Sequence, residues 1–358
     1  MKYRRTGKVL PSIFLFLILP ACQIPIAAGL PFLPPTSTPT ASQTFTSTTT
    51  QTATATLTAT ATATQTATAT PTETLTATQT PTSAPSTHRV VIVSIDGLRP
   101  DAILLAPMPN LIGLMQSGAS SLGARTVFPS ITLVAHASML TGMCPSKHGV
   151  DWNDYLPERG YAQGIDLFDI AHAAGLRTEM YVGKKKMQQI TEPSSLDNFV
   201  LVNDSDSVLM DRLISDFPQD FGVLFIHLVE TDLTGHAYGW LSPEQLSTIQ
   251  RADEALGRLF AELDARNLRD DTLIIVTADH GGNGQGHGSD SRENMTIPWI
   301  AAGPGIQPKT LTTLVHTMDT AATAAFALGL EIPYEWDGVP VYEAFGLPVG
   351  KPSVECQH

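Results

Sequence analysis

Three apolar runs in this chain each lead to an aspartate, and two of those aspartates have a histidine close by. The runs, at residues 90–95, 223–229 and 273–276, precede Asp96, Asp232 with His236, and Asp279 with His280. Carboxylates that converge in a folded protein repel one another and are costly to desolvate unless cations lie between them. Imidazole nitrogens combined with carboxylate oxygens suit zinc better than calcium or magnesium, with manganese and iron as alternatives. These residue types therefore predict a metal site.

The elements that must position these residues are strands of a parallel sheet. Unbroken β-branched runs are typical of strands that are buried on both faces, and ligands of open α/β sheets bind at the carboxyl ends of such strands. Helical spacing predicts helices at residues 109–118, 166–175, 243–267 and 319–328, and a further strand is expected at residues 178–182. This alternation predicts an α/β domain with a mostly parallel central sheet and helices on both faces.

Thr132 lies in a segment, residues 128–142, in which a proline is followed by helical spacing. We expect this threonine in the first turn of a helix, where free backbone N–H groups and the helix dipole favour an anion such as an alkoxide or a phosphate. The alternative interpretation is a hydroxyl that merely caps the helix.

Four segments resemble, in the same order along the chain, motifs of the alkaline phosphatase superfamily and specifically of the type I phosphodiesterase and nucleotide pyrophosphatase family. They are residues 94–101, residues 128–142 with 145–150, residues 230–239, and residues 278–281 with 286–288. No single short motif is specific, but their shared order is. The resemblance extends over nearly the whole chain from His88 onward.

The resemblance implies two divalent ions, expected to be zinc. The ligands of one ion would be Asp96, Asp279, His280 and the Thr132 oxygen, and those of the other Asp232, His236 and His287. His316 is the alternative to His287, because some family members place this ligand further along the chain. Gly235 disfavours a helix around Asp232 and His236, so that we expect a loop there.

The resemblance also implies the role of Thr132. One ion would lower the pKa of its hydroxyl and the other would stabilise the opposite oxygen, giving a phosphothreonine intermediate and net retention at phosphorus. His136, one helical turn later, is a candidate to contact the substrate or the ligands. The family's Phe-Pro-Asn-His after the nucleophile is absent, and Ala135 replaces its asparagine. Asn153 is expected either to supply an equivalent donor or to cap a turn.

The function that this resemblance implies is hydrolysis of a small phosphate ester, as a phosphodiesterase or nucleotide pyrophosphatase. A phosphomonoesterase or a phosphonate hydrolase would use the same site, because these enzymes differ in the walls of the pocket. A sulfatase is discounted, since residues 144–147 lack the arginine and the spacing of a Cys-x-Pro-x-Arg motif. An inactive surface binding module on a stalk is the alternative from another class, but such a module would be expected to lose some metal ligands.

The amino terminus predicts export. Residues 1–22 combine a basic start with an apolar run too short to span a membrane, and they end on Leu-Pro-Ala-Cys. This ending resembles a bacterial lipobox, which would make Cys22 the acylated first residue and the only attachment to a membrane. Ordinary signal cleavage a few residues later is the alternative. We expect a lipoprotein at the cell surface or facing the periplasm, or otherwise a secreted protein.

Residues 23–87 are rich in Thr, Ala and Pro and nearly free of charge, which predicts a disordered stalk before a catalytic domain at residues 88–358. The formal net charge of -13 argues against nucleic acid as a partner. The one basic cluster, residues 184–186, is interpreted as a solvated loop face in preference to a substrate contact. Cys144 and Cys356 are candidates to pair in an oxidising compartment.

Overall fold

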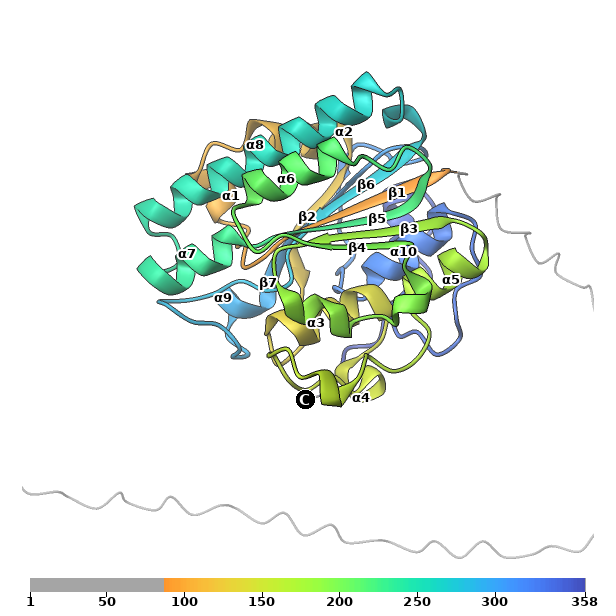
Figure 1. Ribbon diagram of the computed structural model, residues 1–358, viewed down its shortest axis with the longest axis horizontal. Helices are drawn as coiled ribbons and strands as arrows, with labels where there is room; N and C mark the ends of the chain where they lie inside the picture. Colours follow the sequence, from red (N-terminus) through yellow and green to blue (C-terminus); the bar gives the residue numbers. More distant parts are fainter. Residues whose placement is uncertain (1–86, 358) are drawn as a thin grey trace, which may run out of the picture. The chain divides into compact units, whose positions relative to one another are not determined.

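An eight-stranded sheet runs through the part of the chain that the computed structural model describes, residues 87–357 (Figure 1). The signal peptide predicted at residues 1–22 and the linker predicted at residues 23–87, except for Thr87, lie outside the described residues. The strand order is β4-β3-β5-β1-β6-β7-β2-β8, and β7 alone among these strands runs opposite to the others. The predicted mostly parallel sheet is therefore confirmed.

The three apolar runs form the adjacent central strands β1 (Arg89–Ile95), β5 (Phe221–Leu228) and β6 (Thr272–Thr277). Every residue of these strands is buried except Arg89, as expected for strands covered on both faces. In the parallel register, Ile95 pairs with Leu228 and Ser94 with Thr277. The carboxyl ends of the three strands therefore meet at one edge of the sheet.

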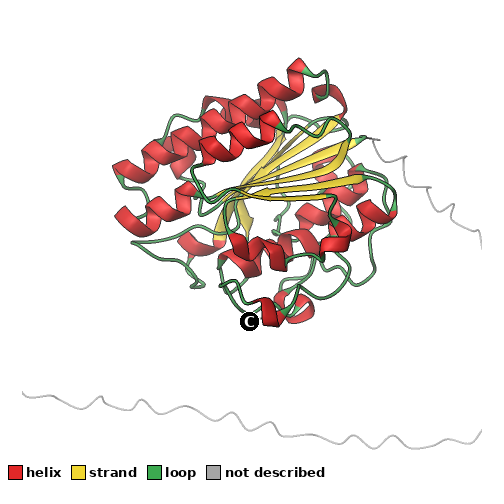
Figure 2. Ribbon diagram, in the orientation of Figure 1, coloured by secondary structure: helices red, strands yellow, loops and turns green. Residues whose placement is uncertain are grey.

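Helices cover both faces of the sheet, which forms the middle layer (Figure 2). One layer holds α1 (Ala102–Leu105), α2 (Pro109–Ser117), α6 (Asp206–Ser215), α7 (Glu230–Tyr238) and α8 (Pro243–Ala265). The other holds α3 (Thr132–Thr141), α4 (Pro145–His148), α5 (Leu167–Ala173) and α10 (Asp319–Ala327), while α9 (Arg292–Met295) precedes β7. The four predicted helices are confirmed. Among residues 87–357, no helix has both the length and the apolarity to cross a bilayer.

The start of each long helix follows from local sequence. Asp166 accepts from the backbone N–H groups of Phe168 and Asp169 and completes a capping box at α5. Ser242 caps α8 by accepting from Gln245 N, and Pro243 occupies the first helical position, where its missing N–H costs nothing.

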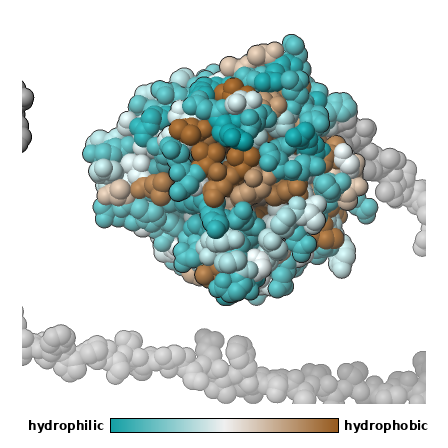
Figure 3. Space-filling view, viewed as in Figure 1, coloured by the Kyte–Doolittle hydropathy of each residue, from teal (hydrophilic) through white to brown (hydrophobic). Residues whose placement is uncertain are grey.

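The remaining strands are β2 (Ala119–Arg125), β3 (Arg177–Val182), β4 (Asn198–Leu201), β7 (Thr296–Ala302) and β8 (Lys309–Thr310). The strand predicted at residues 178–182 is confirmed as β3. β2 has no β-branched run, and it forms a strand because it pairs with β7. β4 is an edge strand with half-buried apolar residues. Apolar residues also gather in the middle of the molecular face that Figure 3 shows.

The loop expected around Asp232 and His236 is wrong, because both residues lie on the helix α7. Gly235 does not break this helix. A Cβ atom at Gly235 would lie 2.9 Å from the Trp240 ring and 2.7 Å from the Gln245 amide, so that the glycine allows α7 to pack closely. Tertiary packing thus explains a residue that local propensity alone argues against.

A disulfide bond joins Cys144, next to α4, to Cys356 near the carboxyl terminus. The two cysteines are separated by 212 residues, so the bond closes a long loop of the chain. The segment is also held by Asp337, whose carboxylate accepts from Cys144 N at 2.9 Å and from Lys147 Nζ at 2.6 Å.

We expect loss of this disulfide to lower the free energy of unfolding by about 2–5 kcal/mol, because the unfolded chain would regain the freedom that the long loop removes. Urea unfolding of the wild type should be compared with a Cys144→Ser/Cys356→Ser double variant and with wild type under a reducing agent. Unchanged midpoints in both comparisons would contradict the expectation.

Glu343 joins the 3-10 helix Tyr342–Phe345 to the segment after β8. Its carboxylate accepts from Thr312 N at 3.0 Å and from Thr313 N at 2.8 Å, and Lys309 Nζ lies 3.1 Å away. Burial opposes its charge, but these contacts outweigh burial and lower the pKa of Glu343 from 4.5 to about 2.

Because the pKa of Glu343 is lowered by folding, its ionised form stabilises the fold above pH 4.5, and this contribution is lost as the pH falls toward about 2. We expect Glu343→Gln to lower the free energy of unfolding by about 1–3 kcal/mol at pH 7. The difference from wild type should shrink between these two pH values in urea titrations. Glu331→Gln, at an exposed glutamate, is the control, and a pH-independent difference would refute the assignment.

Candidate functional site

The residues that sequence motifs single out meet at the carboxyl edge of the sheet. Asp96 follows β1, Asp232 and His236 lie on α7 after β5, Asp279 and His280 follow β6, His287 lies in the loop before α9, and Thr132 begins α3. Two overlapping groups have ligand atoms within 4.8 Å of one another: Asp232, His236 and His287 in one, and Asp96, Asp232 and His280 in the other. The tertiary structure thus gathers residues from five segments into one site.

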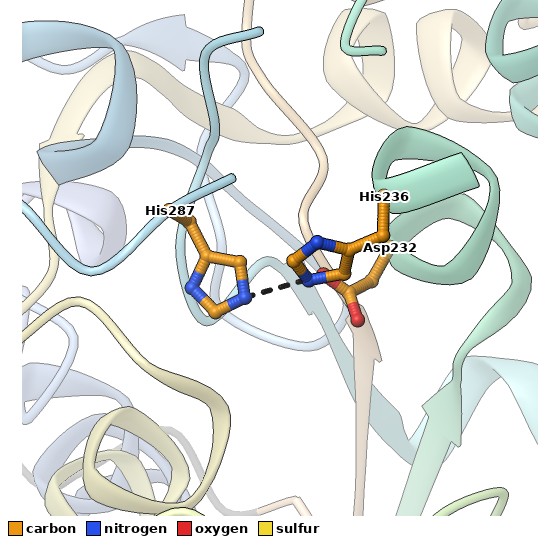
Figure 4. Close-up of side chains that lie close together, drawn as sticks. All are labelled: Asp232, His236 and His287. Atoms are coloured by element: carbon orange, nitrogen blue, oxygen red, sulfur yellow. Dashed lines mark ion pairs between the residues drawn. The ribbon is translucent and has the colours of Figure 1, made fainter. Parts of the chain in front are cut away.

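In the first group, two imidazoles face a single carboxylate oxygen. His236 Nε2 lies 3.4 Å and His287 Nε2 3.5 Å from Asp232 Oδ1. Figure 4 shows the two rings and the carboxylate pointing toward one another. The i,i+4 spacing on α7 puts Asp232 and His236 on the same helix face, while the glycine-rich loop brings His287 from the other side.

Asp96 and His280 of the second group lie deeper in the molecule, next to Asp279. His280 Nε2 is 3.5 Å from Asp96 Oδ1 and 3.2 Å from Asp279 Oδ2, and all three side chains are fully buried. The rings of His280 and His287 stack at a centroid distance of 3.7 Å, which places the two groups side by side.

Hydrogen bonds to backbone carbonyls define the tautomer of all three histidines. Nδ1 donates to Gln285 O at 2.9 Å in His236, to Gly281 O at 2.8 Å in His280, and to Ser130 O at 2.8 Å in His287. A carbonyl oxygen can only accept, so Nδ1 carries a proton and Nε2 is the ring nitrogen that points at the carboxylates. This arrangement is typical of metal-binding histidines.

Each of the three carboxylates has one oxygen held by protein donors and one oxygen without a partner. Lys184 donates to Oδ2 of both Asp96 and Asp232 at 2.6 Å. Asp279 Oδ1 accepts from Gly97 N at 3.1 Å and His280 N at 2.9 Å. Within the three carboxylates and the adjacent His280, the buried atoms without a hydrogen-bond partner are Asp96 Oδ1, Asp232 Oδ1, Asp279 Oδ2 and His280 Nε2.

Such partnerless atoms cost about 1–3 kcal/mol each when they stay unsatisfied. All four belong to residues expected to bind metal, and lone pairs that face one another across a few ångströms repel. The residues therefore fit divalent ions that accept mixed nitrogen and oxygen ligands.

Burial and neighbouring charges set the protonation of the site. Burial opposes the charge of Asp96, but Lys184, the hydrogen bond from His227 and the charges of His227 and His280 together outweigh burial and lower the pKa of Asp96 well below its usual value. Burial and the charge of Asp96 together raise the pKa of Asp279. Burial lowers the pKa of His280 to about 4 and also lowers the pKa of His287. Both imidazoles are thus neutral at pH 7, the form that binds a metal.

Thr132 is the first helical residue of α3, as the sequence predicts, and it is buried beside the carboxylates. Ile131 is the N-cap residue, and no side-chain capping bond is present, so the Thr132 hydroxyl does not cap the helix. Lys184 Nζ lies 3.4 Å from Thr132 Oγ1.

His136 and Asn153 support the start of α3. His136 Nδ1 donates to Thr132 O at 2.7 Å, and its Nε2 lies 2.8 Å from Ser94 Oγ. Asn153 Oδ1 accepts from Leu133 N at 3.0 Å, so Asn153 satisfies a free N–H of the first helical turn. Both side chains therefore orient the segment that carries Thr132.

His316, the alternative to His287, lies apart from this site. Its Nδ1 is 2.7 Å from Ser353 Oγ and its backbone N donates to Asp319. Neither of these partners belongs to the carboxylate cluster.

The sequence favours no role in the site for three residues that lie in it: Lys184, Lys186 and His227. His227 Nε2 lies 2.9 Å from Asp96 Oδ2, and Lys186 Nζ donates to Asn153 Oδ1 at 3.0 Å. The solvated-face interpretation of residues 184–186 is wrong for Lys184, whose side chain is only 15% exposed. The position of Lys184 in the sequence could have indicated its role. Lys184 follows the carboxyl end of the predicted strand β3, and the carboxyl ends of parallel strands meet at the same edge of the sheet.

Family models match most of the catalytic region. The model described as Type I phosphodiesterase / nucleotide pyrophosphatase matches residues 90–285, and the model described as Sulfatase matches residues 242–330. The first range contains Thr132 and nearly all of the carboxylate and histidine cluster.

Curated relatives match over about half of this chain. An uncharacterized pyrophosphatase/phosphodiesterase of Schizosaccharomyces pombe is 28% identical over 217 residues, which cover 54% of this chain and 44% of that protein. A venom phosphodiesterase of Naja atra is 28% identical over 216 residues, which cover 54% of this chain and 26% of that protein. The chain thus spans less than half the length of these relatives.

Among solved structures, the inactive murine ectonucleotide pyrophosphatase / phosphodiesterase 5 in complex with AMP has a TM-score of 0.62 at 17% identity. The match covers 73% of this chain and 99% of that chain. At this identity the likeness concerns the fold, and it confirms the alkaline phosphatase-like architecture. The Type I phosphodiesterase / nucleotide pyrophosphatase model matches more than half of the residues of this chain. The chain therefore belongs to the type I phosphodiesterase / nucleotide pyrophosphatase family.

Proposed function

We propose that this protein is an exported, metal-dependent hydrolase of small phosphate esters that works through a phosphothreonine at Thr132. The observation that carries the proposal is the Thr132 hydroxyl at a helix N-terminus, 3.4 Å from the Lys184 ammonium group that also bonds Asp96 and Asp232, whose free oxygens face imidazole Nε2 atoms. Family membership supports phosphodiester or pyrophosphate bonds as the target. The relatives are longer proteins, and their activities support this proposal without establishing it for the present chain.

The expected ligands divide between two ions, proposed to be zinc. One ion would be held by Asp96, Asp279, His280 and Thr132 Oγ1, and the other by Asp232, His236 and His287. When bound, the ions act as Lewis acids that favour the ionised hydroxyl and stabilise negative charge on the phosphoryl group and the leaving oxygen.

The protein's own groups would then carry out the displacement. Thr132 Oγ1 forms a bond to phosphorus while the bond from phosphorus to the leaving oxygen breaks, and water later cleaves the phosphothreonine. The first-turn N–H groups of α3 and the helix dipole favour the negative charge that gathers there. His136 and Asn153 hold the first turn in place through their bonds to Thr132 O and Leu133 N.

Export is supported by observations of two kinds. The Cys144–Cys356 disulfide persists only in an oxidising compartment. Relatives include a venom phosphodiesterase of Naja atra and ectonucleotide pyrophosphatase/phosphodiesterase family member 3 of Rattus norvegicus. We further propose that Cys22 carries a lipid anchor, with residues 23–87 as the stalk of the catalytic domain, and that nucleic acid is not a partner.

Replacement of Thr132 tests the nucleophile. Thr132→Ala is expected to reduce turnover by about 10³-fold or more, since it removes the hydroxyl at the start of α3 and the Ser130 hydroxyl two residues earlier donates to Ser289 O. Thr132→Ser retains a hydroxyl and part of the activity. Turnover should be measured on p-nitrophenyl phosphate, p-nitrophenyl thymidine 5′-monophosphate and p-nitrophenyl sulfate. Undiminished turnover in Thr132→Ala sinks the assignment, and a wild type that is inactive on all three esters favours a binding module.

Metal content tests the ligand set. We expect about two zinc equivalents per chain in the purified protein by mass spectrometry, and a chelator should remove both the metal and the activity. His287→Ala should lose about one equivalent, because its Nε2 faces Asp232 Oδ1, while His316→Ala should keep both. If instead His316→Ala lost one equivalent and His287→Ala kept both, His316 would be the metal ligand in place of His287.

A further inference from the structure

Two lysines point into the site from the turn that follows β3. Lys184 precedes the 3-10 helix Lys185–Gln189, and Lys184 and Lys186 face the carboxylate cluster and the start of α3. Lys185 between them is exposed and lies over the Tyr155 ring, with Nζ 4.3 Å from its centroid. Gly183 allows this turn to approach closely, because a Cβ there would lie 2.5 Å from Val229.

The Lys184 ammonium group lies next to the proposed nucleophile, and the Lys186 ammonium group is linked through Asn153 to the helical turn that carries it. Lys184 Nζ is 3.4 Å from Thr132 Oγ1, and Lys186 Nζ donates to Asn153 Oδ1, the same oxygen that accepts from Leu133 N. When Thr132 Oγ1 attacks phosphorus, the non-bridging oxygens of the phosphoryl group must lie around the first turn of α3. The two lysines therefore flank the space that these oxygens occupy.

Neither lysine occupies the carboxylate oxygen atoms that are left open for the expected metal ions. Lys184 takes Oδ2 of Asp96 and Asp232, while Oδ1 of each stays without a partner. Lys186 forms no ion pair within residues 87–357, and its one side-chain acceptor there is the neutral amide of Asn153. Its positive charge is thus not neutralised by direct contact with a carboxylate and remains for a ligand.

The charge of the phosphoryl group decides how strongly these lysines act. A phosphate diester carries one negative charge, whereas a monoester carries about two at neutral pH. Cations held in a partly desolvated site stabilise the doubly charged group more strongly, and clamps of Lys or Arg on a transferring phosphoryl group are a recurrent device.

We propose that Lys184 and Lys186 bind the non-bridging oxygens of the transferred phosphoryl group and shift the preference of this enzyme from the diester bonds that family membership supports to phosphate monoesters. This inference rests on the proposed function, because it requires Thr132 to attack the phosphorus. Both lysines keep their protons throughout, while the bond to Thr132 Oγ1 forms and the bond to the leaving oxygen breaks.

The test compares p-nitrophenyl phosphate with methyl p-nitrophenyl phosphate, which share a leaving group and differ by one methyl group and one charge. The wild type is expected to have the higher kcat/KM for the monoester. In Lys186→Gln the ratio of kcat/KM for monoester to diester should fall by about tenfold or more, the effect of one lost charge-assisted hydrogen bond. Lys186→Arg should retain most of the ratio, and the matched control Lys185→Gln should leave it unchanged.

Competitive inhibition by inorganic phosphate provides a second measurement that does not depend on the leaving group. Its inhibition constant should rise by about tenfold in Lys186→Gln but not in Lys185→Gln. Lys184→Gln should also lower the ratio of kcat/KM for the monoester to that for the diester. This variant provides the test if Lys186→Gln fails to fold. The thermal unfolding of each variant should be measured to verify that it is folded.

A wild type that prefers the diester, or a Lys186→Gln variant that loses both activities by the same factor, would overturn the selectivity while leaving the nucleophile assignment intact. Failure of the proposed function has a different signature: the wild type cleaves neither ester, or Thr132→Ala retains full turnover.

Discussion

The mutual repulsion of three buried carboxylates is the constraint on which the site depends. Asp96, Asp232 and Asp279 meet because three adjacent parallel strands end at one edge of the sheet. Burial makes their charges costly, and only positive groups close to them offset this cost. Much of the surrounding structure consists of donors and cations that hold these carboxylates in fixed orientations.

The orientation is specific at the level of single atoms. Lys184, His227 and backbone N–H groups occupy one oxygen of a carboxylate and leave the other oxygen facing an imidazole Nε2. Backbone carbonyls in turn bind Nδ1 of the histidines, which selects the tautomer that offers Nε2. Similar layered support is typical of metal sites, where outer contacts position the ligands.

Lys184 links this support to Thr132, the proposed nucleophile. A single ammonium group contacts two carboxylates and approaches Thr132, so that the turn after β3 belongs to the site as much as the motif-bearing segments do. Lys186 extends the positive charge toward Asn153 and the first turn of α3. The residues proposed for specificity and those expected to bind metal therefore lie on one wall of the site, and the types of these lysines alone do not reveal a function.

The sequence by itself determined the elements that carry the site and which residues most of it contains, because strand periodicity and the residues at strand ends are local properties. It predicted β1, β5, β6 and the position of Thr132 at the start of α3, but not the helix around Asp232, since Gly235 is explained only by its packing against Trp240. Only the tertiary structure brought His287 rather than His316 to Asp232, turned Lys184 inward and paired Cys144 with Cys356. These features depend on contacts between residues far apart in the chain, whose loop paths no local pattern encodes.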